Sequence, residues 1–227
     1  MSIRVCVFDA YGTLFDVGSA ASTLALEPGN EKLKKSWVKL ATDWRHKQLQ
    51  YSWLRAIMDR HSDFWTVTQD GLDWALEANQ LDGDLELRNK LLELYFRLAP
   101  YPEVSKMLGD LKSQNLCTAI LSNGSPQMLS GAVEAAKITE LLDKVISVEE
   151  VGIFKPDMRV YNLIEEKFSY RREEVLFCSS NCWDSIAASE FGFKAVWVNR
   201  SKEPIDRLLN LKLLEVSDLS DIPDLIS

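Results

Sequence analysis

The sequence predicts an α/β protein in which a doubly wound parallel sheet forms a Rossmann-like core and an all-helical cap domain is inserted into that core. Two observations predict this fold. Short apolar runs typical of buried strands alternate with helical patterns along most of the chain, an order that favours a parallel sheet flanked by helices. One long stretch after the first run carries no strand pattern. We therefore expect the core at residues 1–15 and 99–227 and the cap at residues 16–98.

Five apolar runs are expected to form the sheet, and four helices are expected to connect them. The strands are expected at Ile3–Phe8, Cys117–Leu121, Lys144–Val148, Val175–Cys178 and Ala195–Val198. The helices are expected at Glu103–Gln114, Pro126–Ala136, Asp157–Phe168 and Cys182–Phe191. Ser125 and Pro126 form a typical helix start, and Gly192 forms a typical helix end. The acidic chain after Lys202 is poorly patterned, and its end is expected to pack loosely on the core.

The cap is expected to consist of helices at Glu31–His61, with a break, Val67–Asn79 and Asp84–Phe96. A helical insertion just after the first strand can cover a site at the end of the sheet and exclude water from it. Pro100-Tyr101-Pro102 then forms a stiff return to the core. Five tryptophans of this region are expected to build the cap core or a dimer face: Trp37, Trp44, Trp53, Trp65 and Trp74.

Composition narrows the class of protein. With 227 residues, 46% hydrophobic and 26% charged, the chain is of the ordinary globular kind. It has no apolar run of membrane-spanning length and no signal-peptide pattern, so a cytoplasmic location is expected. The net charge of −8 argues against nucleic acid or an anionic membrane as a partner. The four cysteines are expected to be buried free thiols. The two histidines are expected to be surface or structural residues rather than catalysts.

Polar residues follow several of the predicted strands, where open α/β sheets bind their ligands. Asp9 closes the first run and is the predicted reaction centre. Ser122-Asn123 follows the second run, and Ser179-Ser180-Asn181-Cys182-Trp183-Asp184 ends the fourth. Each of the two later segments could also be only a capped turn between a strand and a helix. Asn181 and Asp184 are suited to orienting and deprotonating a water molecule near Asp9.

Two cations stand where the local pattern disfavours them. Lys155 lies at a predicted helix start, where the helix dipole disfavours a cation by up to about 1 kcal/mol. An aspartate nucleophile would compensate for this, and a surface position is the alternative. Arg45 lies within an apolar row and needs an anion there, although it could equally extend past its neighbours or pair with Asp43. The row consists of Trp37, Ala41, Leu49 and Trp53.

Five segments in the same order resemble the L-2-haloacid dehalogenases (type II) of the haloacid dehalogenase-like hydrolase superfamily. They are DAYGTLFDV, WRHKQLQYSWLR, LSNGSP, FKPDMRVY and SSNCWD, and together they extend over nearly the whole chain. Phosphatases of that superfamily usually place a second aspartate where Tyr11 stands and use it to protonate the leaving group. A phenol, with a pKa near ~10, is a weak acid at neutral pH. The leaving group should therefore need no proton, and a halide ion meets this requirement.

The phosphatases also place a carboxylate where Ser179 stands and use it to hold magnesium. Without that carboxylate the site has too few anionic oxygens for strong magnesium binding. We therefore expect neither a metal nor a cofactor. The nearest rival function is a magnesium-dependent phosphatase of the same superfamily, and the second rival is a non-catalytic homologue that keeps the fold.

The resemblance implies a role for each polar residue near the nucleophile. Asp9 would attack the α-carbon that bears the halogen, and Thr13 would support the nucleophile loop. The halide would be received by Arg45 and Asn123, and the substrate carboxylate would be held by Ser122. The remaining polar residues would support the nucleophile or position the hydrolytic water: Lys155, Tyr161, Ser179, Asn181 and Asp184.

The implied substrate is a small anionic haloacid, bound by an alkyl pocket of Tyr11, Leu49, Phe64 and Trp183. His46 departs from the family pattern, because several relatives carry glutamine there. The implied reaction converts an L-2-haloacid to a D-2-hydroxyacid with inversion, through an aspartyl ester on Asp9 that water then hydrolyses. A homodimer is also expected.

Overall fold

Six parallel strands form one sheet in the order β3-β2-β1-β4-β5-β6 in the computed structural model, which describes residues 2–208 and 213–226. This arrangement confirms the predicted fold class. The strands are β1 (Val5–Phe8), β2 (Cys117–Ser122), β3 (Lys144–Ser147), β4 (Val175–Ser179), β5 (Lys194–Val198) and β6 (Leu214–Val216). All four residues of β1 are buried, as expected of a central strand covered on both faces.

Four helices pack around the sheet in the core: α5 (Val104–Ser113), α6 (Pro126–Ala135), α7 (Met158–Phe168) and α8 (Cys182–Phe191). The predicted start and end signals are confirmed. Ser125 caps α6 by accepting a hydrogen bond from the Met128 amide, with Pro126 in the first turn. Gly192 ends α8 with φ at +108°, a conformation that glycine adopts without strain.

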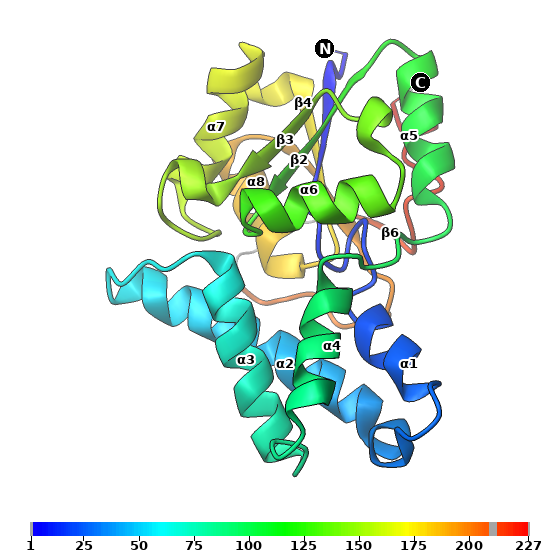
Figure 1. The fold of residues 1–227 in the computed structure, drawn as a ribbon. Helices are drawn as coiled ribbons and strands as arrows, with labels where there is room; N and C mark the ends of the chain where they lie inside the picture. The colour runs from blue at the N-terminus through cyan, green and yellow to red at the C-terminus, as the bar shows by residue number, and fades with distance from the viewer. Residues whose placement is uncertain (1, 209–212, 227) are drawn as a thin grey trace.

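The cap consists of α1 (Ser19–Ala25), α2 (Glu31–Ile57), α3 (Phe64–Ala78) and α4 (Leu85–Tyr95). Figure 1 shows these helices as a separate layer below the carboxyl end of β1. The predicted break in α2 is wrong, because residues 31–57 contain neither proline nor glycine and form one continuous helix. The short helix α1 was not predicted. The other two cap helices lie where expected, within three residues at each end.

Two chain crossings join the cap to the core. The amide of Asp16 donates to the Ala99 carbonyl at 2.9 Å, and the amide of Tyr101 donates to the Leu14 carbonyl at 2.9 Å. The outgoing and returning chains are therefore paired at one place, which we call the hinge and define as residues 14–16 and 99–101. The domain boundaries at residues 15/16 and 98/99 stay a prediction, and this pairing supports them.

The C-terminal region packs more tightly than expected. β6 pairs with β5 at the edge of the sheet, and Leu219 and Ile222 are completely buried. The prediction of loose packing is therefore wrong for this part of the tail, while residues 209–212 and 227 lie outside the described part of the chain. Cys6, Cys178 and Cys182 are buried free thiols, as expected, and Cys117 is half-buried. No helix among the described residues is long and apolar enough to cross a membrane.

Candidate active site

The register of the sheet places Asp9 between two polar strand ends. Phe8, the last residue of β1, is paired with Ile120 on β2 and with Cys178 on β4. Asp9 therefore leaves the sheet beside the carboxyl ends of both neighbouring strands, and its amide donates to the Cys178 carbonyl at 2.9 Å. The residue is 6% exposed. The prediction that Asp9 directly follows the carboxyl end of the first strand is confirmed.

A tight turn follows Asp9 and places a hydrogen-bond donor against its carboxylate. The amides of Leu14 and Phe15 both donate to the Ala10 carbonyl. Gly12 has φ at +89°, and a Cβ atom there would lie 2.9 Å from the Ser180 hydroxyl, so no other residue fits without strain. The turn directs the Thr13 hydroxyl back to Asp9 Oδ2, at 3.2 Å.

Three donors from separate segments contact the Asp9 carboxylate. Besides Thr13, the Asn181 Nδ2 amide donates to Oδ2 at 3.1 Å, and the Lys155 ammonium donates to Oδ1 at 3.2 Å. Asn181 stands at the start of α8, and Lys155 precedes α7. The carboxylate is thus fixed in orientation by the chain segments that follow β1, β3 and β4.

Lys155 is buried and shared between two carboxylates. It is 1% exposed, and its Nζ lies 3.2 Å from Asp9 Oδ1 and 2.9 Å from Asp184 Oδ2. Burial disfavours the ammonium, but the charges of Asp184 and Asp9 outweigh burial and raise the pKa of Lys155. Lys155 therefore stays charged at neutral pH. The surface position that the sequence left open for it is wrong.

Asp184 is a buried base in a polar setting. Its Oδ1 accepts a hydrogen bond from the Tyr161 hydroxyl at 2.7 Å. Burial raises the pKa of Asp184, while the Lys155 charge and the bond from Tyr161 act in the opposite direction. Burial also raises the pKa of Tyr161 well above its usual value, and so does the charge of Asp184. Tyr161 therefore stays a neutral donor, and Asp184 is a stronger base than an exposed aspartate.

Arg45 reaches from the cap into this site. Its Nη2 donates to the Tyr11 carbonyl at 3.1 Å and to Asn181 Oδ1 at 3.3 Å. Asp43, the alternative structural partner, instead pairs with Lys39 at 2.6 Å and accepts a hydrogen bond from Asn79 at 2.9 Å. Among the described residues, the side-chain hydrogen bonds of Arg45 thus join it to the nucleophile loop and to the residue that precedes α8. This geometry supports the interpretation of Arg45 as a site residue.

Three further predicted site residues shape the backbone around the nucleophile. Ser122 Oγ accepts from the Gly124 amide at 3.1 Å, and Ser179 Oγ accepts from the Asn181 amide at 3.1 Å. Asn123 Oδ1 accepts from the Lys155 amide at 2.9 Å, and its Nδ2 group donates to no other side chain or carbonyl among the described residues. The turn-forming and ligand-binding interpretations of these strand ends are therefore compatible.

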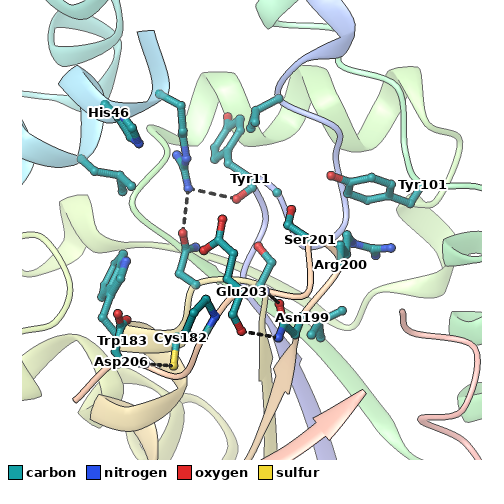
Figure 2. Close-up of a pocket in the computed structure, with 18 of the residues that line it drawn as sticks. Tyr11, His46, Tyr101, Cys182, Trp183, Asn199, Arg200, Ser201, Glu203 and Asp206 are labelled. Carbon is teal, nitrogen blue, oxygen red and sulfur yellow. Dashed lines mark hydrogen bonds between the residues drawn. The ribbon is translucent and has the colours of Figure 1, made fainter. Parts of the chain in front are cut away.

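A cavity of about 540 Å³ opens between the cap and the core. Tyr11, Leu49 and Trp183, three of the predicted alkyl-pocket residues, line it together with Arg45 and His46. Figure 2 shows His46 and Trp183 on one side of the cavity and Arg200 beside Tyr101 on the other.

Phe64, the fourth predicted pocket residue, does not line this cavity. It is buried against the ring of Tyr11, at 5.9 Å between centroids, and the ring of Phe154, at 6.0 Å. Its aromatic character predicted burial but could not distinguish the cavity wall from the layer next to it.

Tyr11 is suited to packing rather than proton transfer. Its ring stacks on Tyr95, and burial raises its pKa well above the usual value of a tyrosine, as do the neighbouring Tyr95 and Asp9. Its hydroxyl is buried without a hydrogen-bond partner in the described structure. The close approach of Gly124 accommodates the ring, because a Cβ atom there would lie 2.7 Å from Tyr11 Cε2. A buried phenol of this kind is a poor source of a proton at neutral pH.

The sequence reasoning missed the wall of the cavity that follows β5. Asn199, Arg200, Ser201 and Glu203 line the cavity. Asn199 folds this segment by accepting from the Glu203 amide at 2.8 Å and donating to the Glu203 carbonyl at 2.9 Å. The rule that ligands bind at carboxyl strand ends would have identified the segment, because it directly follows the run Ala195–Val198.

The described residues contain no cluster of three or more histidine, cysteine, aspartate or glutamate side chains arranged to hold a metal. At the nucleophile, the cation that joins the two carboxylates is the Lys155 ammonium.

Comparison with known proteins places the chain in a family. Residues 3–192 match the family of haloacid dehalogenase-like hydrolases. (S)-2-haloacid dehalogenase 1 of Pseudomonas sp. (strain CBS-3) is 44% identical over 224 residues, which cover 99% of this chain and 96% of that protein. The chain belongs to the L-2-haloacid dehalogenases.

Two further relatives agree with this assignment of the dehalogenase. (S)-2-haloacid dehalogenase 4A of Burkholderia cepacia is 38% identical over 226 residues, which cover 100% of this chain and 96% of that protein. The structure of L-2-haloacid dehalogenase from Xanthobacter autotrophicus with chloropropionic acid covalently bound has a TM-score of 0.86 and 37% identity. The superposition covers 99% of this dehalogenase and 98% of the chain from Xanthobacter autotrophicus.

Proposed function

We propose that this dehalogenase hydrolyses short L-2-haloalkanoic acids to D-2-hydroxyacids with inversion, through an ester on Asp9. The observation that carries the proposal is the Asp9 carboxylate, oriented by Thr13, Asn181 and Lys155. Asn181 lines the cavity together with Arg45 from the cap, and Asp9 contacts that lining through the Asn181 amide. A carboxylate needs no activating base, and a covalent intermediate divides one difficult displacement into two easier steps.

In the first step an Asp9 oxygen forms a bond to the α-carbon while the carbon–halogen bond breaks. The halide leaves with the bonding electrons, and the α-carbon inverts. The Arg45 guanidinium and the free Nδ2 group of Asn123 are the donors that would receive the halide. Ser122 would hold the substrate carboxylate.

In the second step water attacks the carbonyl carbon of the Asp9 ester. Asp184 would accept the proton of that water, supported by its raised pKa. Asn181 would orient the water, since its amide lies against the Asp9 carboxylate. The ester bond then breaks, and the departing alkoxide takes the proton held by Asp184 and leaves as the D-2-hydroxyacid. The new Asp9 carboxyl releases its remaining proton to solvent, which restores the Asp9 carboxylate with one oxygen from water. Lys155, between Asp9 and Asp184, stabilises the negative charge that develops.

A metal is not needed for this sequence of steps. The Lys155 ammonium supplies the positive charge between the two carboxylates. Ser179 offers a hydroxyl, which binds hard divalent cations less well than a carboxylate. The buried, weakly acidic Tyr11 argues against the phosphatase alternative, because an alkoxide leaving group needs a proton that a halide does not.

Single turnover in heavy-oxygen water tests the proposal. With enzyme in excess over L-2-chloropropionate, the first hydroxyacid formed is expected to contain light oxygen, because its new oxygen comes from Asp9. Heavy oxygen is expected in the peptide that contains Asp9, and mass spectrometry measures both. The result should be the same in excess chelator. Heavy oxygen in the first product with an unlabelled Asp9 would mean that water attacks the substrate directly, and dependence on metal would favour the phosphatase alternative.

A homodimer and a cytoplasmic location are parts of the same proposal. Leu54, Ile57 and Met58 are exposed on one face at the end of α2, with Ile57 81% exposed, and a second copy could cover this apolar patch. Ile57→Glu should then shift the particle mass measured by light scattering from two chains to one. A mass of one chain for the wild-type protein would contradict the dimer. The free thiols support a reducing compartment.

A further inference from the structure

Arg200, in the segment that follows β5, joins three segments that are distant in the sequence. Its Nη2 donates to the Thr13 carbonyl at 2.9 Å and to Glu103 Oε1 at 2.6 Å. Its guanidinium lies over the Tyr101 ring, at 3.6 Å from the centroid, and Figure 2 shows the two side by side. Tyr101 belongs to the hinge, and Glu103 precedes α5.

The contact with Thr13 acts on the nucleophile. The Thr13 carbonyl is held by Arg200, and the hydroxyl of the same residue donates to Asp9 Oδ2 at 3.2 Å and accepts from the Ser180 amide at 2.8 Å. Two independent anchors, Arg200 and Ser180, therefore fix the residue that orients the attacking oxygen. A displacement of Thr13 would rotate the Asp9 carboxylate away from the line of attack on the α-carbon.

The same guanidinium connects this loop to the cap. The hinge residue Leu14 follows Thr13, and its carbonyl accepts from the amide of Tyr101, the residue whose ring Arg200 covers, at 2.9 Å. Because Arg45 enters the site from the cap, the distance between the halide donor and the nucleophile depends on how the hinge is held. Arg200 contacts both the nucleophile loop and the hinge through one rigid planar group.

We infer that Arg200 is a positioning residue for the first chemical step. It holds the nucleophile loop against the hinge so that Asp9 and Arg45 stand in the geometry for displacement. This inference rests on the proposed function, because its kinetic test measures the release of halide. The charge of Arg200 is already paired with Glu103, with side chains 17% and 15% exposed, so substrate binding is not its main role.

The chain offers a matched control in Arg172. It makes the same three kinds of contact: it pairs with Glu165 at 2.8 Å, donates to the Phe191 carbonyl at 3.0 Å and covers the Phe191 ring at 3.9 Å. These contacts lie at the end of α8, away from the nucleophile loop. Arg172→Met therefore removes the same three kinds of contact, from a more exposed side chain, without touching the site.

The test compares Arg200→Met, Arg200→Lys and Arg172→Met in single-turnover halide release with enzyme in excess. The rate constant is expected to fall about 10–100-fold in Arg200→Met, the scale of a small misplacement of reacting groups. Arg200→Lys should recover part of the rate, because lysine keeps the charge but loses the planar fork. Arg172→Met should keep the wild-type rate. Binding of propanoate, which carries no halogen and cannot react, should change little in all three variants.

Hydrogen exchange gives a readout that does not depend on catalysis. Amides of the segment Gly12–Phe15 should exchange faster in Arg200→Met than in Arg172→Met. The inference would be overturned if Arg200→Met and Arg172→Met had equal rate constants for halide release and equal hydrogen exchange in this segment. Weakened propanoate binding with an unchanged rate constant would also overturn it, by making Arg200 a substrate contact. A wild-type protein that releases no halide would instead refute the proposed function, and the exchange comparison would still decide the role of Arg200.

Discussion

Lys155→Met is expected to lower the free energy of unfolding by about 3–5 kcal/mol, the typical cost of leaving a buried charge without its partner. The ammonium lies between Asp9 and Asp184, and methionine would keep most of the volume while leaving two buried carboxylates side by side. Each carboxylate would then disfavour ionisation of the other. Halide release should fall as well, because Asp9 loses the donor that contacts its Oδ1 atom and helps to orient the attacking carboxylate. Urea unfolding at neutral pH measures the first effect.

Lys112→Met is the control for this experiment. Lys112 pairs with Asp143 at 2.7 Å, but the two side chains are 33% and 35% exposed. Partly exposed pairs contribute about 0–1 kcal/mol, so this variant should unfold near the wild-type urea concentration and keep its activity. Similar losses in the free energy of unfolding in the two variants would mean that the ammonium of Lys155 does not stabilise the fold more than a partly exposed ion pair does.

The difference in the free energy of unfolding between wild type and Lys155→Met should depend on pH in a definite direction. The pKa of Lys155 is raised in the folded protein, so its contribution to stability is fully present below the pKa of an unfolded lysine, about 10.4. That contribution is lost as the pH rises through the folded pKa. The stability gap between wild type and Lys155→Met should therefore be wide at neutral pH and should narrow under strongly alkaline conditions.

The parts of the fold that were predictable are those set by local pattern. The alternation of apolar runs and helices predicted the parallel sheet, and the polar residues at strand ends predicted where Asp9 and Asn181 meet. The rule for helix dipoles pointed to a compensating anion near Lys155, and the structure provides two. Such rules work because they follow from the backbone, which the sheet arranges in the same way in every protein of this class.

The parts that failed depend on contacts between distant segments. The continuous α2 is stabilised by packing against α1 and α3, which periodicity alone does not reveal. The partner of Arg45 could not be chosen from spacing, since Asp43 is near in sequence while Tyr11 and Asn181 are near only in the folded chain. The strand-end rule points to the segment that contains Arg200, but the partners of Arg200 could not be chosen from the sequence, because they belong to three separate segments.

Asp184→Asn is expected to divide the reaction into its two steps. The amide oxygen of the introduced asparagine could still accept from Lys155 or Tyr161, so the site should keep its shape, and Asp9 should still displace the halide. The ester should then accumulate, because an amide cannot take the proton from water. We expect a burst of about one halide per active site, followed by turnover reduced roughly 10²–10⁴-fold, the usual contribution of a general base. Intact-protein mass spectrometry should detect the acid attached to the protein.

Asp9→Asn should block the first step rather than the second, and it therefore tests whether halide release precedes the attack of water. An amide at position 9 is a weak nucleophile, so this variant should give neither the halide burst nor the protein adduct. Asp157→Asn is the neutral control, because this carboxylate caps α7 and pairs with the exposed Arg159, outside the Asp9 network. If Asp184→Asn turned over at the wild-type rate, another group would be the base. If it gave no burst, Asp184 would act through Lys155 on the first step, and the water-activating role assigned to it would be wrong.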